Sequence, residues 1–140
     1  MASTVDNRPT SSQATWQRTG EPYRLQQTVS FVTTANQLAQ NETMSLFDLP
    51  ADTAVDFAWL EITTADTDVT DVDLGCSTDG SAAADLIDGA TLAATAYVTN
   101  GTYKPAAYNA AELVVLTNKD TETLNEAIVR IIVICRDLSA

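Results

Sequence analysis

The sequence predicts an all-β domain of two packed antiparallel sheets, preceded by an extended N-terminal arm. Short apolar runs of strand length are separated by turn residues at the spacing expected of a β-sandwich. No segment has both the length and the amphipathic period of a helix, and strands do not alternate with helices as in a parallel sheet. The chain has 140 residues, which suffices for one such domain and its core.

The predicted arm covers residues 1–25. It is rich in Ser, Thr, Gln and Asn, is interrupted by proline and glycine, and shows neither a strand nor a helix period. Such a segment is ordered only where it contacts something. Aromatic and Arg side chains most often dominate interface energy, so the predicted partner-binding residues are Trp16, Arg18, Tyr23 and Arg24. The alternative is that Trp16 packs back onto its own domain.

The predicted sandwich covers residues 26–140 and contains about eight strands. They are expected at 28–33, 44–47, 54–64, 72–76, 91–99, 113–117 and 127–136, with a further short strand from Tyr103. Residues 81–89 differ from these runs. Ser81 there is a candidate N-cap and Gly89 a candidate C-cap, which predicts one short helical turn.

The run 54–64 changes its hydrophobic phase. Val55, Phe57 and Trp59 share one face, whereas Leu60 and Ile62 share the other. Because side chains alternate along a strand, this pattern predicts a bulge near Trp59 and Leu60, or a strand buried on both faces.

The last run, 127–136, is largely apolar on both faces. A sandwich with water on its outer side cannot satisfy such a strand alone. The second face is covered either by the short helix and loops of the chain or by a neighbouring subunit, and we favour the subunit. Ile128, Ile132 and Ile134 on that face are therefore the candidate residues of an oligomer interface.

The charge excludes several classes of partner. The net charge is −12, and residues 26–140 carry most of the 19 acidic side chains. A field of this sign repels nucleic acid and anionic membranes. No apolar run approaches the ~20 residues of a membrane span, and the N-terminus lacks a signal-peptide pattern. We expect synthesis in a reducing cytoplasm, which favours thiols at Cys76 and Cys135 but leaves their pairing open.

The sequence offers no catalytic constellation. It contains no histidine, which removes the usual nucleophile activation, zinc ligation and general base. No glycine-rich phosphate loop appears, so we predict neither an enzyme nor a cofactor. The acidic run 66–73 could bind Ca²⁺, but its spacing does not match an EF-hand. A turn followed by a solvated strand is preferred there, with Ca²⁺ binding left open and no metal site assigned.

Several segments resemble small structural proteins of tailed bacteriophages, of the capsid decoration or cement type. They are Ser45-Leu46-Phe47-Asp48-Leu49-Pro50 with the strand 55–64, Val72-Asp73-Leu74-Gly75, Asp85-Leu86-Ile87-Asp88-Gly89 and Ile131-Ile132-Val133-Ile134. The resemblance is one of pattern and spans residues 26–136, with no match for the arm.

The resemblance implies a jelly-roll domain on the exterior of a virion. Such a protein would be made in the host cytoplasm, bind the major capsid protein, stabilise contacts between its subunits, and act as a homodimer or homotrimer. The arm would lie on the capsid lattice. The alternative function is a glycan- or receptor-binding domain of a head fibre or tail tip, with a groove exposing Tyr97, Tyr103 or Tyr108.

Overall fold

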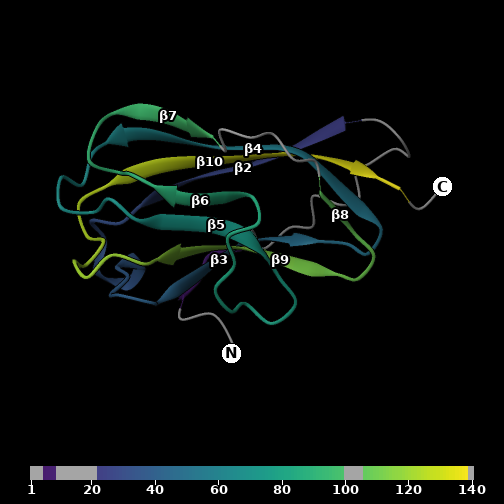
Figure 1. Cartoon of the computed structure of the whole chain (residues 1–140), viewed down its shortest axis with the longest axis horizontal. Coiled ribbons are helices and arrows are strands. Elements are labelled where there is room, and N and C mark those ends of the chain that lie inside the picture. Colours follow the sequence, from purple (N-terminus) through teal and green to yellow (C-terminus); the bar gives the residue numbers. More distant parts are fainter. Residues whose placement is uncertain (1–4, 9–21, 100–105, 139–140) are drawn as a thin grey trace.

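Two sheets, antiparallel except for one short parallel pair, pack face to face in the computed structural model, which describes residues 5–8, 22–99 and 106–138 (Figure 1). One sheet has the order β1-β3-β9-β5-β6. The other has the order β2-β10-β4-β7, with β8 also paired to β4. The strands are β1 (Val5–Asp6), β2 (Pro22–Ser30), β3 (Thr43–Leu49), β4 (Thr53–Thr64), β5 (Val72–Ser77), β6 (Ile87–Ala90), β7 (Ala96–Thr99), β8 (Ala106–Tyr108), β9 (Glu112–Asn118) and β10 (Ile128–Asp137).

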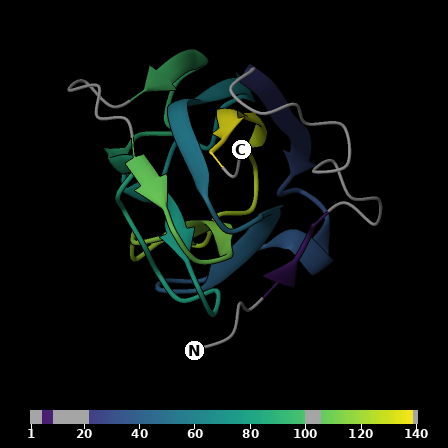
Figure 2. The ribbon, with the colours of Figure 1, turned by 90° about the vertical axis from the view of Figure 1, so that its right-hand side faces the viewer.

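The strand pairing is nested. The outermost pair along the chain is β2 with β10, followed inward by β3 with β9, β4 with β7, and β5 with β6. A long antiparallel hairpin that rolls up into two sheets produces this pattern, which is the jelly roll. The end-on view in Figure 2 shows the two sheets wrapped around a common centre. The predicted all-β sandwich is confirmed.

The core lies between the two sheets. On β10, Val129, Ile131, Val133 and Cys135 point into it, and all four are fully buried. The largest fully buried side chains come from both sheets and their connections: Phe31, Phe47, Leu38, Met44, Leu46, Leu49, Leu60, Ile62, Leu74, Ile87, Leu92 and Leu116. A two-layer domain is held mainly by this burial.

The phase change of β4 occurs earlier than predicted. The register between β4 and β10 shifts between Ile134 and Cys135, which leaves Asp56 as the extra residue of a bulge. Val55 therefore faces the core together with Ala58, Leu60 and Ile62, all of which are buried. Phe57 and Trp59 face outward. The prediction of a bulge near Trp59 and Leu60 was wrong in position, because the apolar pattern of the sequence does not reveal which of the two sets faces the core.

The predicted helical turn at 81–89 is wrong. Residues 81–86 form an irregular segment, and β6 begins at Ile87. This segment belongs to the connection 78–86, which crosses the outer face of the sheet that contains β3, β9 and β5 (Figure 1). The Thr43 hydroxyl donates a hydrogen bond of 3.0 Å to the Gly80 carbonyl across that face. Backbone contacts of this kind leave no room for a regular helix.

Gly75 permits this close packing. A Cβ at Gly75 would lie 2.5 Å from the Ala83 carbonyl carbon and 2.7 Å from its oxygen, and it would also collide with the Asp85 carboxylate. The same carboxylate accepts a 2.7 Å hydrogen bond from the Cys76 backbone N–H and one from the Tyr108 hydroxyl. The connection therefore rests directly on the backbone of β5.

We predict that Gly75→Ala lowers the free energy of unfolding by about 1–3 kcal/mol, the usual cost of overpacking. The added methyl group forces the connection 78–86 away from the sheet. Chemical denaturation monitored by circular dichroism measures the change. Ala82→Ser, at an exposed position of the same connection, should change stability by no more than about 0.5 kcal/mol. Equal stability of Gly75→Ala and the wild type would contradict the packing described here.

Candidate functional site

The outer face of the sheet β2-β10-β4-β7 is the candidate partner-binding surface. The opposite sheet is crossed by the connection 78–86, whereas no described segment crosses this one. At its centre lie Phe57, Trp59, Ile132 and Ile134, which we call the outer strip. The register places Ile132 beside Trp59, and Ile134 beside Phe57.

The aromatic side chains of the outer strip are ordered by each other and by an arginine. The Phe57 and Trp59 rings meet edge to face, with centroids 5.3 Å apart and an interplanar angle of 70°. The guanidinium carbon of Arg24, on β2, lies 5.9 Å from the centroid of the Trp59 ring. Both geometries are favourable for aromatic and cation–π attraction. Phe57 remains 39% exposed.

Ion pairs close both ends of the outer strip. At one end, Arg130 of β10 donates to Glu61 of β4, with 2.7 Å between Nε and Oε2. At the other, Arg136 reaches the bulge residue Asp56 through two hydrogen bonds of 2.6 and 2.9 Å. The bulge thus directs a carboxylate towards the arginine. Such pairs contribute little stability at a surface, but they neutralise charge around the strip.

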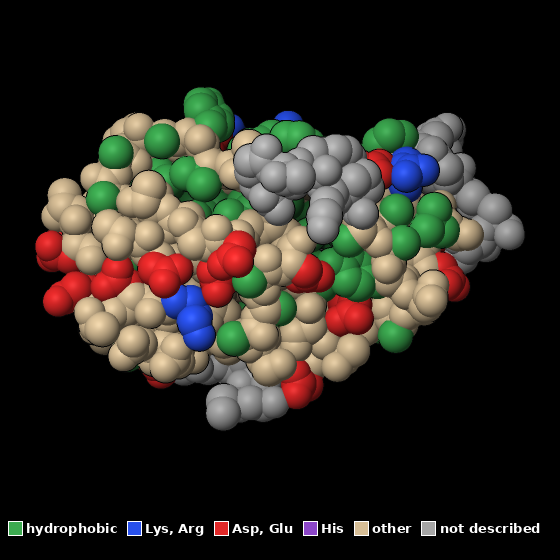
Figure 3. All heavy atoms as spheres, viewed as in Figure 1, with side chains coloured by type: hydrophobic (Ala, Val, Ile, Leu, Met, Phe, Trp, Pro, Cys, Tyr) green, Lys and Arg blue, Asp and Glu red, His purple; other side chains and the backbone are tan. Residues whose placement is uncertain are grey.

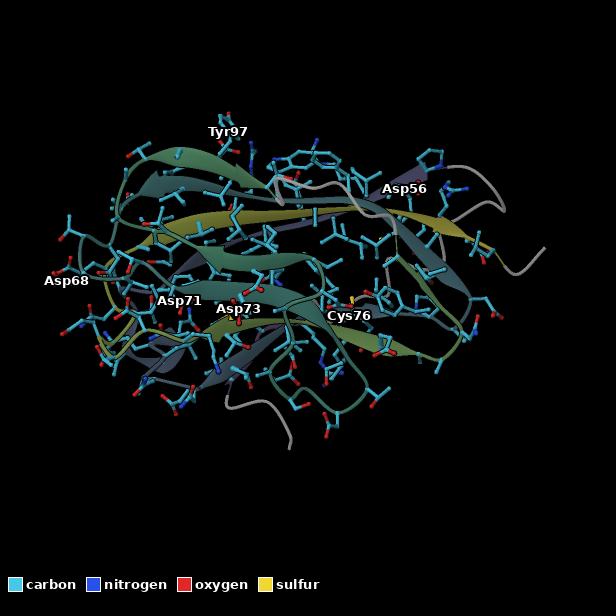
Figure 4. All side chains as sticks on the ribbon, in the orientation of Figure 1. Asp56, Asp68, Asp71, Asp73, Cys76 and Tyr97 are labelled. Atoms are coloured by element: carbon cyan, nitrogen blue, oxygen red, sulfur yellow. The ribbon has the colours of Figure 1, made fainter. Side chains whose placement is uncertain are left out.

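Tyr97 extends the surface onto β7. It lies opposite Glu61 in the register, so both side chains are on the same side of the sheet, and its hydroxyl lies 3.5 Å from Glu61 Oε1. The side chain is 73% exposed and projects away from β7 in Figure 4. Tyr97, Phe57 and Trp59 therefore place three aromatic rings on one face.

The three predicted interface isoleucines all lie on this face of β10, but they are not equally accessible. Ile128 and Ile134 are half-buried, whereas Ile132 is only 1% exposed. Ile132 is flanked by Trp59 on β4 and Gln26 on β2. The sequence reasoning did not identify Phe57 as a surface residue, and it placed Tyr97 at the surface only in the glycan-binding alternative. The bulge at Asp56, had its position been known, would have turned Phe57 outward.

Of the residues predicted for the arm, Trp16 and Arg18 lie outside the described residues. Tyr23 and Arg24 belong to β2 and point to opposite faces. Tyr23 packs against the core beside Cys135, and its burial raises its pKa. Arg24 lies on the outer face.

The predicted arm is connected to the sandwich on both sides of residues 9–21. Val5 and Asp6 form β1, which pairs in parallel with β3. Arg8 binds the carboxylates of Asp6 and Asp48 at 2.7 and 2.9 Å. Pro22 begins β2. The described residues on either side of 9–21 therefore belong to the sandwich.

Asn7 and Gln27 form further hydrogen bonds next to β1. Asn7 Nδ2 lies 2.7 Å from Gln27 Oε1, and Gln27 Nε2 donates to the carbonyls of Asn7 and Leu46. Because Gln27 is on β2 and Leu46 on β3, this side chain connects the two sheets.

The acidic run 66–73 divides into groups with different roles. Asp66 is 1% exposed and accepts backbone hydrogen bonds of 3.0 Å from Asn125 and Glu126, so it organises two loops. In the described part of the chain, no three acidic or cysteine side chains form a metal site. Figure 4 shows Asp68 in the turn, with Asp71 and Asp73 beside β5.

Asp73 has an unusual environment on β5. Its carboxylate is buried and accepts a 2.9 Å hydrogen bond from the Gly89 backbone N–H. Burial, followed by the charges of the neighbouring Asp88 and Asp71, outweighs that hydrogen bond and raises the pKa of Asp73 above 3.8. Ionised Asp73 therefore costs stability at neutral pH.

The two cysteines are free thiols, with Cys76 half-buried and Cys135 buried. Burial raises the pKa of Cys135 to about 12 and also raises that of Cys76. Both are protonated at neutral pH, so neither is a reactive thiolate. No helix within the described ranges has the length and apolar character needed to cross a membrane.

Two solved structures contain chains similar to this one over nearly its whole length. A chain of the acidic stable capsid structure of Helicobacter pylori bacteriophage KHP30 is 19% identical to this chain, with a TM-score of 0.63. The match covers 87% of this chain and 92% of the KHP30 chain. A chain of the capsid of Ralstonia phage GP4 is 13% identical, with a TM-score of 0.68, and covers 88% of each chain. No protein-family model and no curated protein sequence matches. At these identities the likeness establishes a shared fold.

We predict that Asp73→Asn raises the melting temperature at pH 7. The amide keeps the hydrogen bond to Gly89 and removes the charge next to Asp71 and Asp88. The increase in melting temperature should reach its full size at pH values above the raised pKa of Asp73. It should vanish below about pH 3.9, the ordinary pKa, where the carboxyl is protonated in both the folded and the unfolded states.

Thermal unfolding of the wild type and of Asp73→Asn between pH 3 and pH 7 gives the difference in melting temperature directly. Asp68→Asn is the matched control, since it makes the same change of net charge at an exposed turn position. An Asp73→Asn variant that gains no more than this control at pH 7 would show that the buried carboxylate carries no penalty.

Proposed function

We propose that the chain is a decoration, or cement, protein of a tailed bacteriophage, which binds the exterior of the head and stabilises contacts between major capsid subunits. The observation that carries the proposal is the fold. The jelly roll matches chains of two phage capsid structures over at least 87% of each chain. The matched chains are therefore single small domains like this one.

The charge supports a position on the exterior. A shell component that faces the packaged genome lies against phosphates, which bind Lys and Arg and repel carboxylates. This chain carries −12, with 19 acidic residues, and carboxylates spread across the side of the molecule seen in Figure 3. An acidic outer layer also keeps particles dispersed.

A binding protein needs surfaces that gain free energy when covered. The outer strip and its neighbours Tyr97 and Arg24 supply one, since Trp, Tyr and Arg dominate interface energy. Trp16 and Arg18, in the segment between β1 and β2, are the proposed contacts to the capsid. Ile128, Ile132 and Ile134 lie on the face proposed to join copies in a homodimer or homotrimer. We assign no catalytic role to any residue.

The glycan-binding alternative requires tyrosines that converge on one groove. Tyr97 pairs with Glu61 and Tyr108 with Thr53, which places them about 26 Å apart along β4 at ~3.3 Å per residue. Tyr108 is also hydrogen-bonded to Asp85. Tyr103 lies outside the described residues. This separation favours the decoration role.

We predict that the purified protein co-sediments with bare capsids of the phage that encodes it and saturates at a fixed copy number per capsid. This copy number should be a multiple of the number of equivalent positions that the symmetry of the shell provides. A protein that remains in the supernatant at all concentrations would exclude the decoration role, and specific retention on a glycan array would favour the alternative.

We also predict that Trp16→Ala combined with Arg18→Ala weakens capsid binding by at least about tenfold, the effect of losing ~1.4 kcal/mol. Substitutions are preferable to deleting residues 1–24, because that deletion would remove β1 and the first residues of β2. Gln13→Ala with Gln17→Ala is the control from the same segment. Unchanged affinity of the Trp16 and Arg18 variant would show that this segment does not hold the capsid.

A further inference from the structure

The charge of the outer face differs from that of the remaining molecule. The face carries Arg24, Arg130 and Arg136 against Asp56 and Glu61, a net charge of +1. The other residues contain four basic and 17 acidic side chains, a net charge of −13. Two copies that approach through any other face bring carboxylates together, whereas two copies that approach through this face keep them apart.

Screening makes this difference decisive. At physiological ionic strength the Debye length is ~8 Å. In a pair joined through this face, the carboxylates on the β1-β3-β9-β5-β6 sheets of the two copies are separated by both sandwiches, each of which has two sheets ~10 Å apart. Their repulsion is then largely screened, and the apolar contact at the centre is not opposed by local charge.

The size of the face fits a pair of this kind. The strands contribute 9 residues from β2, 10 from β10, 10 residues of β4 paired to β10, and 4 from β7. At ~3.3 Å per residue and ~4.8 Å per strand, the footprint is about 500 Å² on each copy and about 1,000 Å² in total, the lower limit for a specific interface.

We infer that the outer face of β2-β10-β4-β7 binds the same face of a second copy in a two-fold symmetric dimer. This inference rests on the oligomer included in the proposed function and assigns its order. A single surface that pairs with itself closes at two copies, whereas a cyclic trimer needs two different complementary surfaces. Among the described residues, the exposed aromatic side chains Phe57 and Tyr97 lie on this one face.

A two-fold axis along β10 gives complementary contacts. It places β2 of one copy over β4 of the other while each residue keeps its position along the strands. Arg24 shares a row with Ile134 and Phe57. Each Arg24 then meets the Phe57 ring of the second copy, next to the Asp56 carboxylate, and the two Ile134 side chains meet at the axis. Within its own copy, Arg24 stacks on the Trp59 ring.

Sedimentation velocity of the full chain, from about 1 µM to about 1 mM, tests the inference over the range of weak and moderate dimers. The wild type should shift from monomer to dimer. Phe57→Ser and Tyr97→Ser, at side chains 39% and 73% exposed, should each raise the dimer Kd by at least about tenfold. The exposure of Tyr97 keeps that variant informative even if Phe57→Ser fails to fold.

Val32→Ser is the matched control. Val32 is 56% exposed and lies in the turn after β2, outside the proposed interface, so the dimer Kd should not change. A monomer at every concentration, a trimer, or a dimer that neither Phe57→Ser nor Tyr97→Ser weakens would overturn the inference.

Capsid co-sedimentation of the same proteins separates this inference from the proposed function. A wild type that dimerises but does not bind capsids would retain the two-fold interface and remove the decoration role. A monomeric wild type that binds capsids would do the reverse.

Discussion

The continuous pairing of β10 on both of its edges is the constraint on which the sandwich depends. From Ile128 to Arg136 the strand is paired with β2 on one side and with β4 on the other. This brings the first and last long strands of the domain together and requires the remaining strands to nest between them. The same strand is largely apolar on both faces, and only one of these faces can point into the core.

The two sheets resolve their outer faces differently, and this difference produces the candidate site. On the sheet of β3, β9 and β5, the connection 78–86 of the same chain covers part of the outer face. The missing side chain of Gly75 lets this connection lie directly on β5. On the other sheet, the bulge at Asp56 turns Phe57 and Trp59 outward beside Ile132 and Ile134. Exposed apolar side chains that gather on one face often mark protein contacts, which makes this face the candidate site.

Charge and apolar surface are arranged together rather than independently. Arg24 lies beside the outer strip and stacks on Trp59. Arg130 and Arg136 lie at its two ends and bind Glu61 and Asp56. Carboxylates occupy the remaining surface and the loops, where several of them accept backbone hydrogen bonds. The molecule is thus strongly acidic overall and nearly neutral on the outer face of β2-β10-β4-β7.

The sequence by itself determined the all-β class, the two-sheet core, the apolar second face of the last strand and the absence of histidine-based chemistry. Each of these follows from composition or from the alternation of side chains along a strand, which are local properties. The position of the bulge in β4, the irregular path of 81–86 and the opposite directions of Tyr23 and Arg24 were decided only by the tertiary structure. They depend on which residues lie opposite one another across the sheets, and the pairing of strands far apart in the chain sets that register.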